Sequence, residues 1–460
     1  MEEFTISIYV NNKPGVLMRL SQTFARRGYN IDSLVVSPAV DHQFSRITVV
    51  VQGGPETLDQ ILRQLNKLVD VVHASHHDPK QSVERELAIF KLLIGPEKRS
   101  EVLQIVDVFR AKIVDITDQS LIVESTGSSS KIDAMEKLFN TIGLKEMVRS
   151  GKLEMIRPLP LQPGDAVAVV APSSQLRPEQ QRLAEQAFQI LEDDWGLQIA
   201  YTPDLTRSHL HLAGTDQERA AEFQQQLDDE KVRAVFCIRG GYGVARLLPL
   251  LQPTSWHQKP KWLVGFSDCS LLLHYLQRHK GWLVCHGPTL ASPQFVGGPH
   301  ADKNREALRG VLFKSESPSA PVQFLQNPAS VKGRLSGGCL SVILSALGTE
   351  AQVDLADSIL FLEEVYEAPY RLDRMLTQMR QSGQFEKVRA FIFGEFVECG
   401  TPEQVKDVLL DVLGDLNLPM AIGLPHGHGE INHPLLLGQW AELDAQQNAI
   451  HFKNNEPVAT

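Results

Sequence analysis

The pattern of hydrophobic and polar positions divides the chain into two parts with different periodicities. In the first part, apolar and polar residues alternate at 4–10, as in a half-buried strand, and apolar residues recur at helical spacing at 16–27. The same patterns predict strands at 31–37 and 45–51, a helix at 56–68 and a strand at 69–75. Residues 1–78 are therefore predicted to form a βαββαβ unit of the ferredoxin-like kind.

Residues 79–156 repeat this order less regularly. The predicted elements are a strand at 86–94, a helix at 98–109, strands at 111–117 and 120–126, and a helix at 130–142. We interpret the first part of the chain as two related α+β units in tandem.

Three prolines within six residues, Pro158, Pro160 and Pro163, end this pattern. Proline removes a backbone donor and favours extended chain, so residues 157–165 are predicted to form a linker. After it come continuous apolar stretches, with predicted strands at 166–171, 234–238 and 262–265 and helices at 179–192 and 269–278. Such strands suit a parallel sheet covered on both faces, so we predict a doubly wound α/β lobe over 166–310.

From residue 331 the pattern is mixed. A glycine-rich turn, a short helix at 340–347, strands at 359–362 and 390–396 and a final β region predict a second, β-rich lobe over 331–455. The predicted fold class is thus α+β in the first part of the chain and α/β in the second, with the mixed lobe last.

Composition is that of an ordinary globular protein. The 460 residues exceed what one hydrophobic core holds, and 43% hydrophobic and 22% charged residues exclude a disordered or collagen-like chain. The net charge of −10 lies wholly after residue 157, because the first 157 residues hold 20 basic and 20 acidic side chains. An acidic chain without a basic patch argues against nucleic acid as a partner.

Cysteine usage and the N-terminus indicate the compartment. Five cysteines without CxxC spacing argue against a disulfide framework and a zinc ribbon. The acidic, alternating N-terminus lacks the features of a signal peptide, and no apolar run approaches 18 residues. We therefore expect a soluble, cytoplasmic protein without a membrane partner.

Two strand ends in the second part carry candidate chemistry. Ser267 lies between a predicted strand and a helix, where a sharp turn lifts a hydroxyl above the sheet, although helix N-caps are also commonly serine. The glycine that would complete the GxSxG pattern is Cys269 here. The segment Arg239-Gly-Gly-Tyr-Gly243 follows another strand; its bare amides suit an oxyanion, and a tight turn also explains its glycines.

A carboxylate pair and a histidine cluster complete the candidates. Glu363 and Glu364 end an apolar strand, and since side chains alternate along a strand we expect Glu363 to face inward; a surface strand end has the same pattern. Residues 425–433 contain three histidines, but the metal-site spacings HxHxDH and HExxH are absent, which favours one working histidine over a metal. Serine, histidine, carboxylate and a glycine loop are together the components of acyl transfer.

Several short segments of the second part follow one another in the order of a known family. They are Pro163-Gly-Asp165, Val170-Ala-Pro-Ser173, Arg239-Gly-Gly-Tyr-Gly243, Gly265-Phe-Ser-Asp268, His286-Gly-Pro288, Leu362-Glu-Glu-Val365, Pro369-Tyr-Arg-Leu-Asp-Arg-Met-Leu376 and Leu424-Pro-His-Gly-His-Gly429. Residues 163–452 thereby resemble the LD-carboxypeptidase, or muramoyltetrapeptide carboxypeptidase, family of serine peptidases. The resemblance implies a nucleophile at Ser267, a base at His428, its partner at Glu363 and oxyanion donors at the amides of Gly241 and Asp268.

The reaction that this resemblance implies is release of the terminal D-alanine from the tetrapeptide of murein fragments, without metal or cofactor. Arg239 is a candidate for binding the terminal carboxylate, from its charge and position. Two departures leave the substrate preference open: Cys339 stands where the family often has Asn, and Glu364 where it often has Asp.

Candidate ligand positions in the first part lie around its first helix. Asn12 and Gly15 precede this helix and Asn30 follows it; a helix N-terminus with bare amides binds a carboxylate, although a turn and a helix stop explain the same residues. With the segments 67–72, 83–86, 109–115 and 127–131, they resemble the regulatory (small) subunit of acetolactate synthase, with its ACT domain. The resemblance implies a homodimer that binds valine as an effector through these three residues and regulates a separate large subunit.

Several functions stay open at this point. The first hypothesis is a bifunctional fusion of regulatory subunit and carboxypeptidase. The second is a regulatory protein with an inert hydrolase part, and the third is an amino-acid-regulated peptidase without a synthase partner. Peptide antibiotics of the microcin C type are an alternative substrate. The intact set of Ser267, Glu363 and His428 argues against an inert hydrolase part.

Overall fold

The structure, a computed structural model, describes residues 2–38, 43–76, 82–156, 158–252, 260–280, 282–349 and 351–452. The chain contacts separate two compact units, which divide between Arg157 and Pro158. This division falls at the start of the predicted linker, although Arg157 itself lies outside the described residues, as do residues 77–81 around the predicted boundary at 78. Among the described residues, no helix combines the length and apolarity needed to cross a bilayer.

The first half of the first unit has the order strand, helix, strand, strand, helix, strand. The elements are β1 (Glu2–Asn11), α1 (Val16–Ala25), β2 (Ser33–Pro38), β3 (Phe44–Gly53), α2 (Pro55–Leu65) and β4 (Val71–His76). Their strands form an antiparallel sheet in the order β2-β3-β1-β4. Alternate residues of β1, such as Ile6 and Ile8, are buried in one core with Leu20 and Phe24 of α1, which explains the alternation along the strand.

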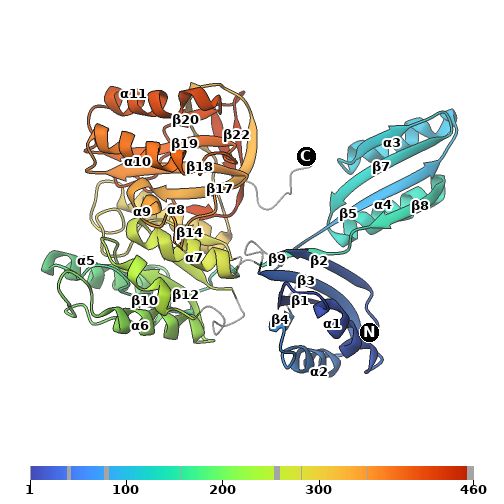
Figure 1. The fold of residues 1–460 in the computed structure, drawn as a ribbon, viewed down its shortest axis with the longest axis horizontal. Helices are drawn as coiled ribbons and strands as arrows, with labels where there is room; N and C mark the ends of the chain where they lie inside the picture. Colours follow the sequence, from blue (N-terminus) through green and yellow to red (C-terminus); the bar gives the residue numbers. More distant parts are fainter. Residues whose placement is uncertain are drawn as a thin grey trace. The chain divides into compact units, whose positions relative to one another are not determined.

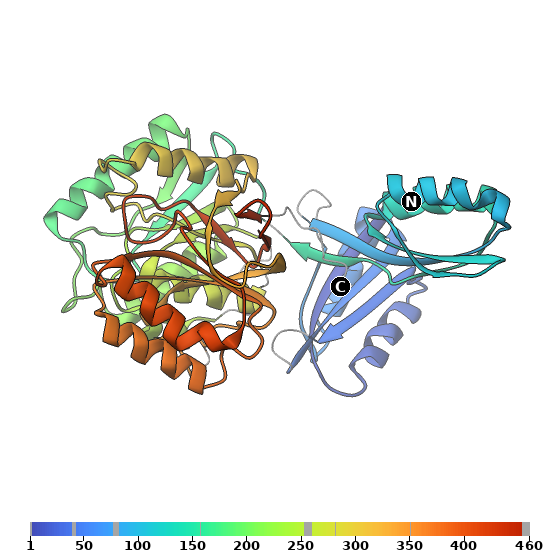
Figure 2. The same cartoon turned by 90° about the horizontal axis from the view of Figure 1, so that it is seen from above.

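A second antiparallel sheet, in the order β6-β7-β5-β8, fills the rest of this unit, and β9 pairs with β5. The elements are β5 (Ser82–Leu93), the 3₁₀ turn η1 (Pro96–Lys98), α3 (Arg99–Val108), β6 (Lys112–Ile116), β7 (Ser120–Gly127), α4 (Ser129–Ile142), β8 (Leu144–Arg149) and β9 (Leu153–Ile156). The sequence patterns did not predict β8 and β9. Buried Phe90 and Leu92 pack on α3 and α4, which cover one face of this sheet (Figure 2). Ile89 of β5 and Val148 of β8 are exposed on the other face, which is therefore open and apolar.

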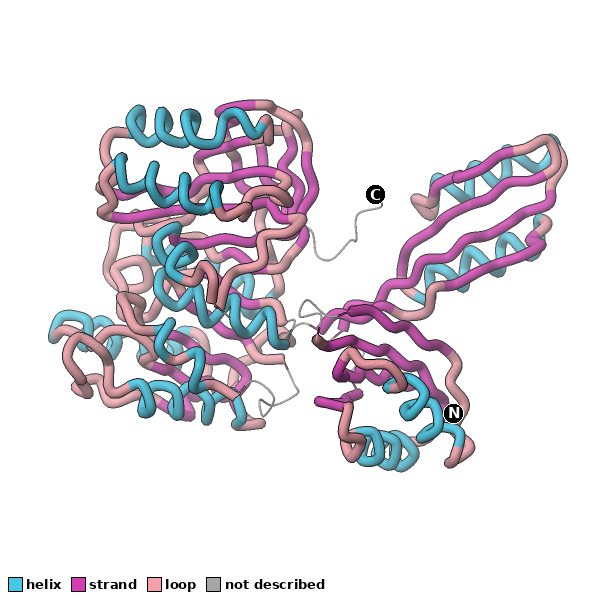
Figure 3. Tube along the Cα trace, in the orientation of Figure 1, coloured by secondary structure: helices cyan, strands magenta, loops and turns pink. Residues whose placement is uncertain are grey.

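The second unit begins with a six-stranded sheet in the order β11-β10-β12-β13-β14-β21, whose first five strands are parallel. Its elements are β10 (Ala166–Val170), α5 (Pro178–Gln189), the π-helical turn η2 (Ile190–Asp194), β11 (Gln198–Tyr201), α6 (Asp216–Asp228), β12 (Val232–Cys237), the 3₁₀ turns η3 (Val244–Arg246) and η4 (Leu248–Leu250), β13 (Trp262–Gly265), the 3₁₀ turn η5 (Ser267–Cys269), α7 (Ser270–Lys280), β14 (Val284–His286) and α8 (Ala301–Lys314). Helices and strands alternate along the trace, as Figure 3 shows. Chain order reverses between β10 and β12, and such switch points are where open α/β sheets place their sites.

An eight-stranded sheet follows, in the order β15-β23-β22-β17-β18-β19-β20-β16. Its elements are β15 (Ala320–Pro321), β16 (Gln323–Gln326), β17 (Val331–Cys339), α9 (Leu340–Ser345), β18 (Ser358–Val365), α10 (Pro369–Gln381), β19 (Ala390–Val397), α11 (Pro402–Leu413), the 3₁₀ turn η6 (Gly414–Leu416), β20 (Met420–Ile422), β21 (Leu435–Leu437), β22 (Trp440–Asp444) and β23 (Ala449–Phe452). Strands β17 to β20 are parallel, and α10 and α11 share a core with β18 and β19.

The structure corrects the predicted division of the second part at two points. Strand β21 lies within the predicted lobe over 331–455 but completes the sheet of the preceding lobe, and β15 and β16 precede residue 331 yet belong to the later sheet. One hydrophobic cluster also joins Leu263 of β13, Leu272 of α7 and Phe361 of β18. Helix α7 therefore lies between the two sheets, as Figure 1 shows, and the two lobes share part of their core.

Candidate functional site

Ser267 occupies a strained turn between β13 and α7. Its φ is +59°, in the left-handed region that residues with a side chain rarely adopt. The turn follows directly from Gly265 and Phe266 at the carboxyl end of β13, where open α/β sheets present their functional groups. Ser267 does not cap a helix through its side chain, so the N-cap interpretation is wrong.

Three side chains from separate elements meet here in one line of hydrogen bonds. The Ser267 hydroxyl lies 3.1 Å from Nε2 of His428, and Nδ1 of His428 lies 2.6 Å from Oε2 of Glu363. Glu363 comes from β18 and His428 from the loop between β20 and β21, so 161 residues separate His428 from Ser267. The structure thus brings together the three residues predicted from the sequence.

Burial and charge act on this line in opposite ways. Burial lowers the pKa of His428, but the hydrogen bond and the charge of Glu363 outweigh it, so the net pKa is raised above the usual 6.5. Burial raises the pKa of Glu363, and the bond from His428 opposes this rise. The geometry therefore favours a proton on Nδ1 of His428 and leaves Nε2 free to accept the proton of Ser267.

Glu364 is as buried as Glu363, which the prediction of one inward-facing glutamate missed. Alternation holds, but both faces of β18 are covered, so Glu364 is buried on the other face. Its carboxylate accepts hydrogen bonds from the backbone N–H of Ser341 at 2.7 Å and of Val365 at 2.9 Å. Glu364 thereby fixes the start of α9 and does not bond to His428.

A bulge in β19 makes room for the loop that carries His428. The register between β18 and β19 shifts so that Gly394 and Glu395 lie opposite Glu363. A β-carbon on Gly394 would lie 2.2 Å from the carbonyl oxygen of His426, so only glycine permits this close approach. The N–H of Glu395 donates to that same carbonyl at 3.0 Å, which holds the loop against the strand.

The glycine loop after β12 lies against the Ser267 turn. A β-carbon on Gly240 would lie 3.0 Å from Cβ of Ser267, and Gly241 has a φ of +119°. The buried Asp268 carboxylate accepts bonds from the hydroxyl of Ser173 at 2.5 Å and from the N–H of Val244 at 3.0 Å. Through the bond from Val244, the carboxylate ties the end of the loop to the turn. Burial raises the pKa of Asp268, and the two hydrogen bonds oppose this rise.

Sequence reasoning assigned no role to Ser173 and did not find Arg219. Arg219 of α6 is fully buried and donates to the carbonyl oxygens of Pro172 and Gly243, the latter at 3.1 Å. It therefore clamps the loop after β10 to the loop after β12. In the sequence Arg219 is one of many polar residues in the stretch 216–228, and only the strand order places β10 beside β12.

Arg239 lies at the start of the glycine loop and is partly buried. Its guanidinium donates to the carbonyl of Gln175 at 2.5 Å and to the side chain of Gln180 at 2.7 Å. Burial and the nearby charge of Arg177 lower its pKa. Among the residues that the structure describes, no carboxylate pairs with Arg239, so a positive charge stands near the site without a counter-ion.

The histidines of residues 425–433 do not converge on one point. His426 bonds to His286 and to the carbonyl of His433, whereas His428 bonds to Ser267 and Glu363. Within the described ranges, no three His, Cys, Asp or Glu side chains lie close enough together to hold a metal ion.

The predicted effector residues fall at both ends of α1. Asn12 and Gly15 share the turn before the helix, where Gly15 has a φ of +85°. Asn30 lies beyond the other end and donates to Asp32 at 2.7 Å. Since a ten-residue helix is about 15 Å long, one copy of the chain does not bring Asn30 to Gly15.

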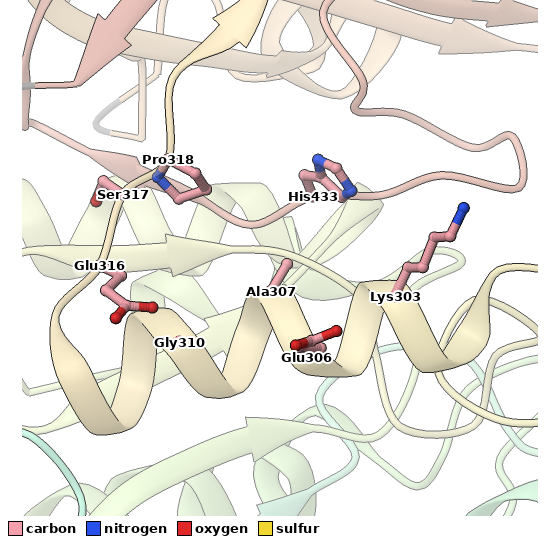
Figure 4. A pocket seen from close by; sticks show the side chains of 8 residues that line it. All are labelled: Lys303, Glu306, Ala307, Gly310, Glu316, Ser317, Pro318 and His433. Carbon is pink, nitrogen blue, oxygen red and sulfur yellow. The ribbon is translucent and has the colours of Figure 1, made fainter.

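A cavity of about 620 Å³ lies over α8 (Figure 4). It is lined by Lys303, Glu306, Ala307, Gly310, Glu316, Ser317, Pro318 and His433. The lining contains none of the predicted site residues. His433 nevertheless links this cavity to the interior, because its backbone carbonyl is the acceptor for His426.

Comparison with known proteins separates the same two parts. The family models for the LD-carboxypeptidase N-terminal and C-terminal domains match residues 167–287 and 332–443. The models for the AHAS small subunit-like ACT domain and for the small subunit of acetolactate synthase match residues 6–73 and 85–158.

Individual relatives cover each part almost end to end. A putative carboxypeptidase of Synechocystis sp. is 39% identical over 304 residues, which is 65% of this chain and 97% of the relative. A probable acetolactate synthase small subunit of Archaeoglobus fulgidus is 42% identical over 153 residues, or 33% of this chain and 96% of the relative. The solved muramoyltetrapeptide carboxypeptidase of Oxalobacter formigenes superposes with a TM-score of 0.55 at 27% identity, covering 62% of this chain and 97% of its own.

Proposed function

The chain belongs, in its second unit, to the LD-carboxypeptidase family and, in its first, to the family of acetolactate synthase small subunits, and we propose that it is a bifunctional fusion of the two activities. The second unit is proposed to be a serine carboxypeptidase that releases the terminal D-alanine of murein tetrapeptides. The observation that carries this proposal is the unbroken line of hydrogen bonds from Ser267 through His428 to Glu363.

In the proposed mechanism, His428 accepts the proton of Ser267 as the hydroxyl oxygen attacks the peptide carbonyl. Nε2 is in place for this transfer, since it lies 3.1 Å from the hydroxyl. Glu363 stabilises the imidazolium that forms, because its carboxylate lies 2.6 Å from Nδ1 in a fully buried position. His428 then returns the proton to the leaving amine of D-alanine, and water releases the peptide from Ser267.

The negative oxygen of the tetrahedral intermediate needs donors beside Ser267. We assign them to the backbone amides of Gly241 and Asp268, each contributing about 3 kcal/mol to transition-state stabilisation. The support is the position of the glycine loop against the Ser267 turn and the bond from Val244 to the Asp268 carboxylate, which holds loop and turn together.

Arg239 is the proposed partner of the substrate's terminal carboxylate. It carries a charge without a counter-ion among the described residues, and two hydrogen bonds, to Gln175 and Gln180, fix its guanidinium. A carboxypeptidase must select a free chain end, and a fixed guanidinium does so by charge and geometry.

The test measures D-alanine release from a murein tetrapeptide by the full-length protein. Ser267→Ala should lower the rate of hydrolysis at least about a thousandfold, because loss of a triad member removes the acyl-enzyme route. A tetrapeptide ending in L-alanine is the stereochemical control, and a peptidyl-nucleotide of the microcin C type is the competing substrate. Unchanged turnover by Ser267→Ala would disprove the nucleophile, while preference for the nucleotide would disprove the murein substrate.

For the first unit we propose two ferredoxin-like domains, the first of them an ACT domain, that bind valine and regulate a synthase large subunit. The element order and strand order of β1 to β4 support this domain type. Asn12, Gly15 and Asn30 are the proposed effector contacts; because Asn30 lies at the far end of α1, a shared site requires a second copy of the chain. The open apolar face around Ile89 and Val148 supports a protein partner, as such faces are rarely left in water.

A binding experiment with the whole chain tests the regulatory role. An acetolactate synthase large subunit should bind the full-length protein, and valine should change both this binding and the synthase rate. If valine instead changes D-alanine release while no large subunit binds, the chain is an amino-acid-regulated peptidase.

A further inference from the structure

A chain of hydrogen bonds runs through the interior directly behind Ser267. The hydroxyl of Ser270 lies 2.5 Å from the carbonyl oxygen of Ser267 and 2.7 Å from Nε2 of His286. Nδ1 of His286 lies 2.7 Å from Nε2 of His426, whose Nδ1 lies 2.7 Å from the carbonyl oxygen of His433. The side chains come from α7, β14 and the loop after β20. The proposed mechanism does not use them.

Both imidazoles of this chain are sealed from water. His286 and His426 are fully buried, and the rings of Phe266 and Phe361 pack against each of them with centroids 5.1 to 5.6 Å apart. Burial lowers the pKa of His426 to about 3 and that of His286 well below its usual value. Both rings are therefore neutral at neutral pH, and each carries a single N–H proton.

The two ends of the chain fix the direction of its hydrogen bonds. A carbonyl oxygen only accepts, so His426 must donate to His433 from Nδ1 and can then only accept at Nε2. It follows that His286 donates to His426 from Nδ1 and accepts at its own Nε2. Ser270 must then donate to His286, yet the Ser267 carbonyl at 2.5 Å is an acceptor for the same proton.

We propose that Ser270, His286 and His426 are positioning residues for Ser267: they set which of two acceptors receives the Ser270 hydroxyl proton, the Ser267 carbonyl or His286. Four contacts share three protons, so the bond to the Ser267 carbonyl is in competition with the bond to His286. The carbonyl belongs to the residue with the strained φ of +59°, so this competition acts on the backbone that aims the hydroxyl at His428. The inference rests on the proposed role of Ser267 as the nucleophile.

Nitrogen NMR of the full-length protein, labelled at histidine with ¹⁵N, tests the direction of the chain. We expect His286 and His426 to carry their proton on Nδ1, whereas His274, which bonds to the Gly337 carbonyl through Nε2 at 2.8 Å, should carry it on Nε2. In His426→Leu, His286 should switch to the Nε2–H form, because Ser270 then remains as its acceptor. An Nε2–H form of His286 in the unchanged protein, or no switch in the variant, would overturn the proposal.

Kinetics of Ser270→Ala provide the second measurement and do not depend on His426→Leu folding. Loss of the hydroxyl should lower kcat about tenfold and leave KM within about twofold, since the nucleophile loses its aim while the substrate contacts stay. The Nε2 resonance of His286 should also move toward that of a nitrogen without a donor. His274→Asn is the matched control: it removes a buried imidazole outside the chain and should leave kcat within about threefold.

The outcomes separate this inference from the proposed function. If Ser270→Ala changes neither kcat nor the His286 resonance, the positioning role is refuted while Ser267 remains the nucleophile. If Ser267→Ala retains full activity, the proposed nucleophile fails, and with it the role of the chain, whatever the tautomers are.

Discussion

Replacing Glu363 by Gln tests the site most sharply, because the change keeps the shape of the side chain and removes its charge. The second carboxylate oxygen, Oε1, is buried without a hydrogen-bond partner among the described residues. If the new amide points its oxygen at His428, a buried NH₂ group is left without an acceptor, at about 1–3 kcal/mol. If it points its NH₂ at His428, the imidazole proton moves to Nε2, which can then no longer accept the proton of Ser267.

Either orientation removes the negative charge that stabilises the imidazolium. We therefore expect kcat/KM of Glu363→Gln to fall about 10³–10⁴-fold, which corresponds to about 4–5.5 kcal/mol of lost transition-state stabilisation. The acid limb of the pH profile should also move. Glu363 holds the pKa of His428 above 6.5, and without it burial lowers this pKa, so the remaining activity should persist to lower pH.

The assay is coupled D-alanine release from the tetrapeptide, measured from about pH 5 to about pH 9. Glu364→Gln is the matched control, because it makes the same change in a neighbouring buried carboxylate that bonds to Ser341 and not to His428. It should leave kcat/KM within about threefold. If Glu363→Gln retains more than about a tenth of the activity, or if both variants lose equally, the proposed division of roles is refuted.

Further predictions concern the pH profile, the loop, the chain end and the effector. In the unchanged protein, activity should rise with pH through a midpoint above 6.5, since His428 must be neutral to accept a proton; a midpoint below 6 would contradict its raised pKa. Gly394→Ala should lower kcat/KM about 100-fold in the same assay, because its β-carbon would displace the loop of His428. Gly54→Ala is the control and should leave kcat/KM unchanged, because a β-carbon on Gly54 would have no atom within 4 Å. Arg239→Gln should raise KM at least about tenfold for the free acid and little for the C-terminal amide, and equal effects on both would exclude a carboxylate contact. Gly15→Asp should abolish valine binding by calorimetry, since its φ of +85° and a new negative charge both oppose the ligand; unchanged affinity would place the effector elsewhere.

The sequence predicted most of the elements that carry the site and the three residues that meet in it. Ser267 follows β13 directly, as the predicted strand end required, whereas β18 runs on past Glu363 to Val365 and belongs to the other sheet. The histidine was harder, because three lie within residues 425–433, and resemblance to a family selected His428. Spacing alone does not reveal that His426 turns inward to His286, a contact between residues 140 positions apart.

The parts that the sequence missed depend on contacts between distant segments. Helices α6, α8, α10 and α11 were not predicted, and the role of Arg219 in α6 depends on two loops that only the strand order brings together. The burial of Glu364 was missed for a related reason. Alternation of buried and exposed residues is typical of a strand with one face in solvent. Strand β18 instead packs on α10 and α11 with one face and on α7 with the other.

The pairing of β21 with β14 has a consequence for how the protein is made. While the ribosome extends the chain, the edge of β14 has no neighbour until Leu436, roughly 150 residues after its partner Cys285, has been synthesised. At typical rates of translation this takes about 8–30 seconds, during which an apolar strand edge is open to mispairing. The nascent second unit should therefore depend on chaperones, and a message truncated shortly before codon 435 should yield an aggregating product rather than a folded lobe.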